Sequence, residues 1–158
     1  MKEGEWQKYY SNGQLQYLGL YKKNKKQGEW REYYNNGKLA NSGVYYQNIE
    51  VGEHKQYDIL GNIEKKINYA EIENDNNIPM LGKLHGNLIF YYPNGVIRSS
   101  THYSEGKMHG EYFEYYDNEN LKVKGEYLIG EKHGDWLYYS LDGRIEFKER
   151  YSLGKIFY

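Results

Sequence analysis

Aromatic and polar residues alternate along this chain in short segments, and each segment is bounded by residues that favour turns. Successive side chains of a strand point to opposite faces, so residues two apart share a face. In the first two segments, one face carries Trp6, Tyr10, Leu15, Gly19 and Tyr21. Aromatic and β-branched residues favour strands. The pattern therefore predicts an all-β protein of antiparallel strands with one apolar face and no long helix.

A unit of 24 residues repeats along the chain, with the consensus G-E/D-W-x-x-Y-Y-x-N-G-x-L-x-x-x-G-x-Y followed by a G-K-x-H linker. The six repeats begin at Gly4, Gly28, Gly52, Gly86, Gly110 and Gly134. Their last tyrosines are Tyr21, Tyr45, Tyr69, Tyr103, Tyr127 and Tyr151. Each repeat predicts one β-hairpin, so residues 4–158 are expected to form a single array of about twelve strands in an elongated, open antiparallel meander.

The interval between the third and fourth repeats is longer, at 34 residues. The excess lies at about 72–81, where an acidic, polar stretch at 73–77 is followed by Pro79. Such a stretch has no apolar periodicity, and it predicts a surface loop inserted into the array.

The turns predict how the strands pair. Asn12-Gly13, Asn36-Gly37, Asn94-Gly95 and Asp142-Gly143 suit two-residue type I′ turns. Such a turn at Asn12-Gly13 pairs Tyr10 with Leu15 and Trp6 with Gly19. Linker turns centred between Asn24 and Lys25, and between Gly130 and Glu131, set Gly19 against Trp30 and Gly125 against Trp136. Both turns of a repeat thus place a glycine beside an indole. Because glycine has no side chain, it leaves room for the ring.

Alternation then sorts the side chains into two faces. The second repeat adds Trp30, Tyr34, Leu39, Gly43 and Tyr45 to the apolar face. The opposite face is expected to be polar, with Lys122, Lys124, Glu126, Glu146, Lys148 and Arg150. A row of tyrosines shares that face: Tyr9, Tyr33, Tyr57, Tyr91, Tyr115 and Tyr139.

Composition narrows the classes of partner. The chain has 21 tyrosines, three tryptophans and a mean hydropathy of -1.02, which suits a thin sheet whose rings keep a polar tip near water. Its net charge of -1 excludes a general attraction to nucleic acid. There is no cysteine, hence neither a disulfide nor a thiol nucleophile. No apolar run approaches the roughly 20 residues that span a bilayer, and neither compartment nor export is assigned.

With its repeat written out, the chain resembles the MORN-repeat family, in the variant common in bacterial proteins that is labelled a YwqK-type antitoxin. The likeness covers nearly all of residues 4–158 and rests on the Gly-x-Trp, Tyr-Tyr, Asn-Gly and Gly-Lys-x-His-Gly elements. The chain departs from the pattern at His54 and Asp58 in the third repeat, at Glu119 in the fifth and at Glu149 in the sixth. The resemblance implies an elongated antiparallel sheet that holds partners, and it implies no catalytic residues.

Two rows of residues invite a chemical interpretation. His85, His109 and His133 share one repeat position, and equivalent positions in such a sheet lie about 10 Å apart. They cannot converge on one zinc ion, so a structural role in the linker is favoured. The acidic row Glu5, Glu29, Glu53, Glu111 and Asp135 is read as a solvated strand position on a flat surface. With no P-loop or nucleophile elbow, the chain is expected to be no enzyme and to need no metal or cofactor.

The apolar face is the candidate binding site, since a single-layer sheet has nothing else within the chain to cover it. Its candidate residues are Trp6, Tyr10, Tyr21, Trp30, Tyr34, Tyr45, Tyr92, Tyr112, Tyr116 and Trp136. We expect a non-catalytic module that binds or scaffolds a protein partner. The alternatives are packing of these rings against each other, a surface for carbohydrate or phospholipid headgroups, and neutralisation of a toxin. Unpaired edge strands predict either a monomer or a weak homodimer.

Overall fold

A computed structural model describes residues 1–71 and 81–157. Every regular element of these residues is a β-strand, and none is a helix, so none could cross a membrane as one. The all-β prediction is thereby confirmed. The inserted loop predicted at 72–81 lies, except for Leu81, outside the described residues.

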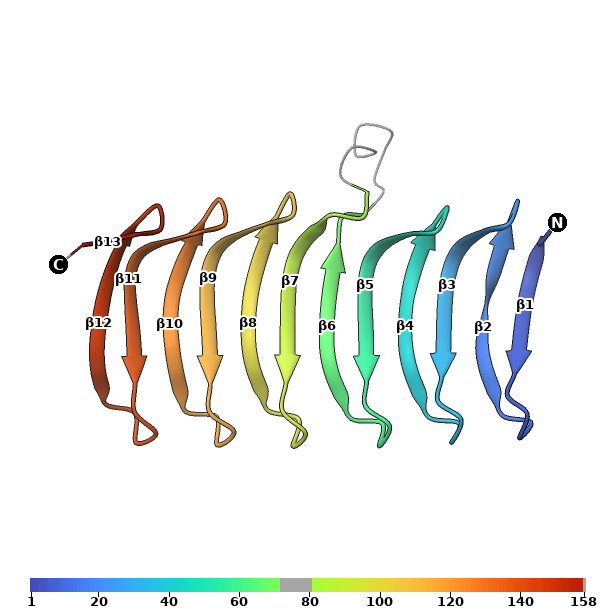
Figure 1. Cartoon of the computed structure of the whole chain (residues 1–158), viewed down its shortest axis with the longest axis horizontal. Helices are drawn as coiled ribbons and strands as arrows, with labels where there is room; N and C mark the ends of the chain where they lie inside the picture. The colour runs from blue at the N-terminus through green and yellow to red at the C-terminus, as the bar shows by residue number, and fades with distance from the viewer. Residues whose placement is uncertain (72–80, 158) are drawn as a thin grey trace. The chain divides into compact units, whose positions relative to one another are not determined.

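The chain divides into two compact units, Met1–Lys83 and Leu84–Tyr158. Unit 1 holds β1 (Gly4–Tyr9), β2 (Leu15–Lys22), β3 (Lys25–Tyr33), β4 (Leu39–Tyr46), β5 (Ile49–Tyr57) and β6 (Ile63–Tyr69). Within it each strand pairs antiparallel with the next along the chain, as Figure 1 shows. Unit 1 is therefore a meander of three hairpins.

Unit 2 is built in the same way from β7 (Leu84–Tyr91), β8 (Ile97–Ser104), β9 (Lys107–Tyr115), β10 (Leu121–Leu128), β11 (Glu131–Tyr139) and β12 (Ile145–Ser152). A short strand that the repeat pattern did not predict, β13 (Lys155–Phe157), pairs with β12. The predicted open antiparallel meander is confirmed, with thirteen strands among the described residues rather than about twelve.

The Asn-Gly turns are not the predicted type I′ turns. At the first one, the Tyr10 amide donates to the carbonyl of Gln14 at 2.8 Å, and the Gly13 amide donates to the carbonyl of Tyr10 at 3.0 Å. Gly13 has a φ of 83°, whereas Asn12 is not among the residues with positive φ. This geometry is a type I turn followed by a glycine bulge. The Asn12 side chain favours it, because Oδ1 accepts from the amide of Gln14 at 3.1 Å.

A bulge at Gln16, just after this turn, changes the pairing and the faces. Leu15 pairs with Tyr9 rather than with Tyr10, and the register shifts between Lys8 and Tyr9. Because directly paired residues share a face, the bulge moves Leu15 to the face of Tyr9, opposite the tryptophans. Leu39 moves in the same way, pairing with Tyr33 and lining a shallow depression with Tyr33 and Arg31.

The type I′ turns are found in the linkers instead. Lys23 and Asn24 have φ values of 51° and 65°, and Lys22 pairs with Lys25, so this turn is centred one residue earlier than predicted. The linker before β11 is also centred one residue earlier, with Leu128 paired to Glu131.

The predicted contact between Gly19 and Trp30 nevertheless holds, because a bulge corrects the register. The pairing passes from Leu20 with Gln27 to Gly19 with Trp30, which leaves Gly28 and Glu29 as extra residues of β3. Gly28 has a φ of 68°, and the glycine that opens every repeat also has positive φ. The first glycine of the repeat is thus required by a bulge that seats the following ring.

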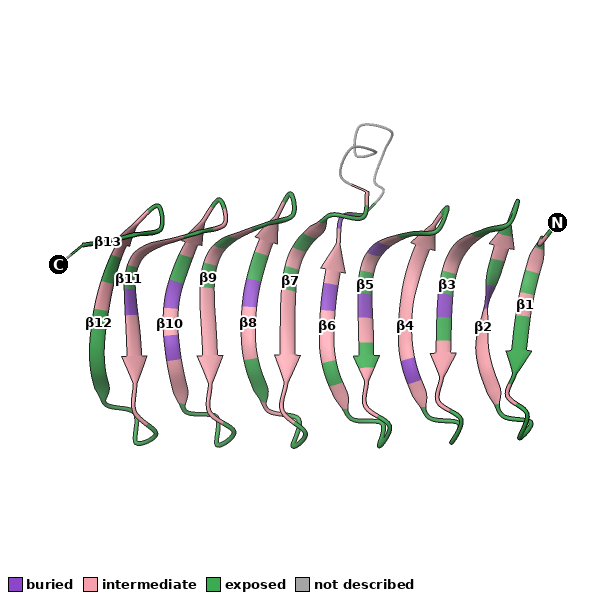
Figure 2. Ribbon diagram, in the orientation of Figure 1, coloured by how far each residue is buried: buried purple, intermediate pink, exposed green. Residues whose placement is uncertain are grey.

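The buried residues form a thin row across the middle of the strands, as Figure 2 shows. Trp30 and Trp136 are the most enclosed of the buried apolar side chains, with 3% and 2% of their surface exposed, and no large side chain of the described residues falls below 2%. The buried polar side chains of this row are His54 and Thr101. Each unit is therefore stabilised by contacts between neighbouring strands and has no thick core.

Candidate binding face

The aromatic face of unit 1 is defined by a continuous row of rings from β1 to β6: Trp6, Tyr21, Trp30, Tyr45, His54 and Tyr69. Each ring meets the next edge to face, with centroid distances from 4.9 Å between Tyr21 and Trp30 to 6.4 Å between Trp30 and Tyr45. Edge-to-face contact is the geometry that aromatic quadrupoles favour. Four of these six residues were candidates from the sequence, and the structure adds His54 and Tyr69.

The row of unit 2 is built in the same way on β9 to β12. Tyr112 meets Tyr127 at 5.8 Å, Tyr127 meets Trp136 at 5.1 Å, and Trp136 meets Tyr151 at 6.3 Å. Tyr112 also stacks on Trp136 at 5.4 Å. Two candidates from the sequence, Tyr112 and Trp136, are thus neighbours on the aromatic face of unit 2.

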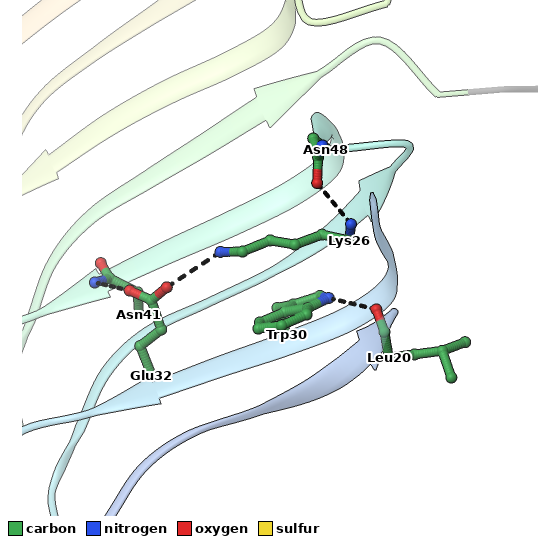
Figure 3. Close-up of polar contacts among 6 residues, drawn as sticks. All are labelled: Leu20, Lys26, Trp30, Glu32, Asn41 and Asn48. Carbon is green, nitrogen blue, oxygen red and sulfur yellow. Dashed lines mark hydrogen bonds and ion pairs between the residues drawn. The ribbon is translucent and has the colours of Figure 1, made fainter. Parts of the chain in front are cut away.

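Lysine side chains lie over the rings. The ammonium of Lys26 is 4.4 Å from the Trp30 ring centroid and 4.6 Å from that of Tyr45. It also pairs with Glu32 at 3.3 Å, and Figure 3 shows the lysine stem extended above the indole. Lys2 lies over Trp6 and Tyr21, and Lys132 lies over Trp136 and Tyr151. Reasoning from the sequence missed these lysines, although all three stand two residues before the first glycine of a repeat.

The indole N–H groups are satisfied within each unit. Trp30 Nε1 donates to the carbonyl of Leu20 at 3.1 Å (Figure 3), and Trp136 Nε1 donates to that of Glu126 at 3.2 Å. His54 Nε2 makes the equivalent contact with Val44 at 2.8 Å. Burial together with this bond leaves the two indoles little surface to offer a ligand, so packing within the sheet accounts for them.

The candidates Tyr10, Tyr34, Tyr92 and Tyr116 stand where the strands enter the Asn-Gly turns. Each hydroxyl donates to a backbone carbonyl one repeat ahead: Tyr10 to Tyr33 at 2.7 Å, Tyr34 to Tyr57 at 2.7 Å, Tyr92 to Tyr115 at 2.9 Å, and Tyr116 to Tyr139 at 2.9 Å. These half-buried tyrosines tie neighbouring hairpins together. Asp58 and Ser140 replace them in the third and sixth repeats and bond within their own turns instead.

Half-buried phenols on the aromatic faces hold their protons tightly. Burial, followed by the charges of Glu50 and Glu32, raises the pKa of Tyr45 to about 12. Burial and the neighbouring Glu114 carboxylate raise the pKa of Tyr112 to about 12. Both tyrosines are therefore neutral hydrogen-bond donors at any physiological pH.

The opposite, charged face carries short ion pairs. Asp135 pairs with Lys148 at 2.7 Å, and the Lys148 ammonium holds the pKa of that carboxyl below its usual value. Glu111 pairs with Lys124 at 3.6 Å, and Glu29 pairs with Arg31 at 3.3 Å. These carboxylates belong to the acidic row, and the pairs lie in solvent, where they contribute little.

The alternation predicted Lys122 on the charged face, and this prediction is wrong: the side chain lies on the aromatic face. Its ammonium pairs with Glu114 at 2.7 Å, and Glu114 also accepts from the hydroxyl of Tyr112, a member of the aromatic row. The register shifts between Leu121 and Val123, so a bulge at Lys122 reverses the alternation there. The Glu114 hydrogen bond raises the pKa of Lys122.

The three histidines of the row, His85, His109 and His133, are not brought together at a metal site. Among residues 1–71 and 81–157, no group of three histidine, cysteine, aspartate or glutamate side chains is placed to hold a metal ion. His85, His109 and His133 each precede the bulge glycine of their own strand.

Comparison with protein families gives one match. The family model described as the MORN repeat variant matches residues 2–23, 26–48, 84–105 and 108–128. These segments cover more than half of the chain and contain most of the first, second, fourth and fifth repeats. No curated protein matches the chain.

Proposed function

The chain belongs to the MORN repeat variant family, and from that premise we propose that it is a non-catalytic module that binds a protein partner through its aromatic faces. MORN repeats generally serve as binding modules for proteins or membranes, and the repeat is not known as a catalytic unit. One observation carries the proposal. Each unit is a single layer of strands, and partly exposed tyrosines on one face of it lie beneath lysine side chains.

The residues of this face divide into two roles. Trp30 and Trp136 support the surface from below, because they are almost fully buried in the isolated chain. Tyr21, Tyr45 and Tyr112 are half-exposed and present ring edges and hydroxyls. Tyrosine is enriched in the hot spots of protein interfaces, since it combines a large apolar ring with a polar tip. A partner would therefore contact the tyrosines and the neighbouring lysines rather than the indoles.

The proposal is tested by affinity capture from the native cell extract, followed by binding assays with variants. We expect Tyr21→Ser, Tyr45→Ser and Tyr112→Ser each to weaken capture in part, since several rings share the contact. Tyr9→Ser and Tyr33→Ser, on the charged face, are the matched controls and should bind as the parent does. Loss of all function from Glu29→Gln, Asp135→Asn or His109→Ala alone would indicate catalysis and overturn the proposal.

Neutralising a toxin is the narrower form of this function that the YwqK-type resemblance implies. It predicts that the captured partner arrests growth when expressed alone and is harmless when expressed with this chain. A partner that is harmless alone would remove the antitoxin role and leave protein binding intact. Retention on glycans or on anionic phospholipid vesicles, with no protein captured, would replace the protein partner by the corresponding ligand.

A further inference from the structure

The aromatic face of unit 1 is hollowed around His54. The hollow has a volume of about 180 Å³, and its lining includes Trp30, Glu32, Tyr45, Glu50, His54 and Tyr69. His54 occupies the position that tryptophan holds in the repeat consensus, and its ring takes the place of an indole in the row. Imidazole is smaller than indole, so the third repeat leaves space where the second and sixth repeats are filled.

The contacts of Lys26 show how this face binds a cation. Its ammonium lies over two rings, Trp30 and Tyr45, and pairs with the carboxylate of Glu32. Figure 3 shows the lysine above the Trp30 indole and its ion pair with Glu32, whose other carboxylate oxygen accepts from the Asn41 amide at 3.3 Å. Two ring faces and one carboxylate together form a cation site, because ring quadrupoles and a negative charge attract the same group. The second repeat fills that site with its own lysine.

The third repeat carries Glu50 where the first, second and sixth carry lysine. Lys2, Lys26 and Lys132 each stand two residues before a bulge glycine, and Glu50 stands two residues before Gly52. Glu50 is half-buried, and after burial its charge is the next cause that raises the pKa of both Tyr45 and Tyr69, so its carboxylate lies near the two phenols. Within the described part of the chain, no lysine or arginine pairs with Glu50.

We propose that this hollow binds a lysine or arginine side chain of the partner protein, with the cation over Tyr45 and Tyr69 and paired with Glu50. The inference rests on the proposed function, which it deepens by naming the chemical group that the partner contributes. The third repeat supplies rings and the Glu50 carboxylate, which pairs with no lysine or arginine of the described residues; Lys55 also lines the hollow, but its ammonium pairs with Glu53 at 2.6 Å. The bound side chain completes the arrangement that Lys26 makes internally. The polar hydroxyls of Tyr45 and Tyr69 suit the rim of such a site.

The test uses the full chain and a capped Gly-Lys-Gly peptide as the probe, with capped Gly-norleucine-Gly as its neutral match. We expect the lysine peptide to shift the His54 imidazole and Tyr69 ring NMR signals saturably, and the norleucine peptide to leave them unchanged. Glu50→Gln should weaken peptide binding about tenfold, as loss of the charged partner of a half-buried cation implies. Glu53→Gln, on the charged face of the same strand, is the control and should bind as the parent does.

Glu50→Lys is the decisive variant. It places in the third repeat the lysine that the first, second and sixth repeats carry, so the chain should fill its own hollow, keep its thermal unfolding midpoint and lose peptide binding. Equal shifts from the lysine and norleucine peptides, or unchanged binding by Glu50→Gln, would overturn the inference. If partner capture survives Glu50→Lys yet is weakened by Tyr21→Ser and Tyr45→Ser, the inference falls and the proposed function stands. If no partner is captured while the peptide still binds, the proposed function falls instead.

Discussion

The indole of Trp30 lies directly against the backbone of Gly19: a Cβ added to that glycine would be 2.2 Å from ring carbon Cδ2. Gly125 stands in the same relationship to Trp136, at 2.3 Å, and Gly43 to the imidazole of His54, at 2.2 Å. None of these glycines has positive φ. They are required by the close approach of a ring and not by backbone conformation.

We therefore expect Gly19→Ala to destabilise the chain. The methyl group would force the indole away from Gly19 and strain the bond from Trp30 to Leu20, at a cost of about 1–3 kcal/mol in the free energy of unfolding. Urea denaturation followed by tryptophan fluorescence measures the change. Glu5→Ala, at an exposed position of β1, is the control and should shift the midpoint little. An unchanged midpoint for Gly19→Ala would mean that the ring lies elsewhere in solution.

Glu119 occupies a position that glycine holds in other Asn-Gly turns, and its φ is 71°. A residue with a Cβ is strained in this region by about 1 kcal/mol. Glu119→Gly should relieve that strain and raise the thermal unfolding midpoint. The reverse change in the preceding hairpin, Gly95→Glu, should lower it by a similar amount. If both variants moved the thermal unfolding midpoint in the same direction, backbone strain at Glu119 would not be the explanation.

Tyr34 links two hairpins through the bond from its hydroxyl to the carbonyl of Tyr57. Tyr34→Phe keeps the ring and removes the donor, which should cost about 1 kcal/mol of stability because a half-buried carbonyl loses its partner. Calorimetric unfolding measures the loss. Tyr9→Phe removes a hydroxyl from an exposed ring and serves as the control. Equal effects from the two variants would show that the bond between hairpins contributes nothing.

Stability should fall at alkaline pH because the folded chain holds phenol protons more tightly than the unfolded chain does. The pKa of Tyr45 rises from 10.0 to about 12 on folding, so its contribution is fully present below pH 10.0 and is lost as the pH rises towards 12. The urea midpoint should therefore decrease across this window, and Tyr45→Phe should make the decrease smaller. A Tyr45→Phe profile identical to that of the parent would contradict the assignment.

Repeat period and ring-to-glycine pairing could be predicted from the sequence because they depend on residue type alone. Trp6 and Trp30 need a small neighbour on the adjacent strand, and Gly19 is the residue in phase with both. Turn type could not be predicted in the same way. Asn12-Gly13 suits both a type I′ turn and a type I turn with a glycine bulge, and only the hydrogen bonds around Tyr10 distinguish the two.

The candidate site was predicted in part for a related reason. Alternation identified the ring row, but it cannot foresee a bulge, and the bulges at Gln16 and at the equivalent Lys122 changed which side chains share a face. The lysines over the rings were missed because cation–ring contacts depend on side-chain reach. A repeat alignment that compared Lys26 with Glu50 would have revealed the charge reversal in the third repeat.

The contacts of each unit have a consequence for how fast it folds. Each described strand pairs with the strands next to it in the chain, and the tyrosine bonds between hairpins reach 23 residues ahead. Short loops cost little closure entropy, and low contact order accelerates folding. Each unit should therefore refold faster than a β-sandwich of the same length, whose pairings join distant segments. Any hairpin can begin the reaction, and its neighbours then add to it in either direction.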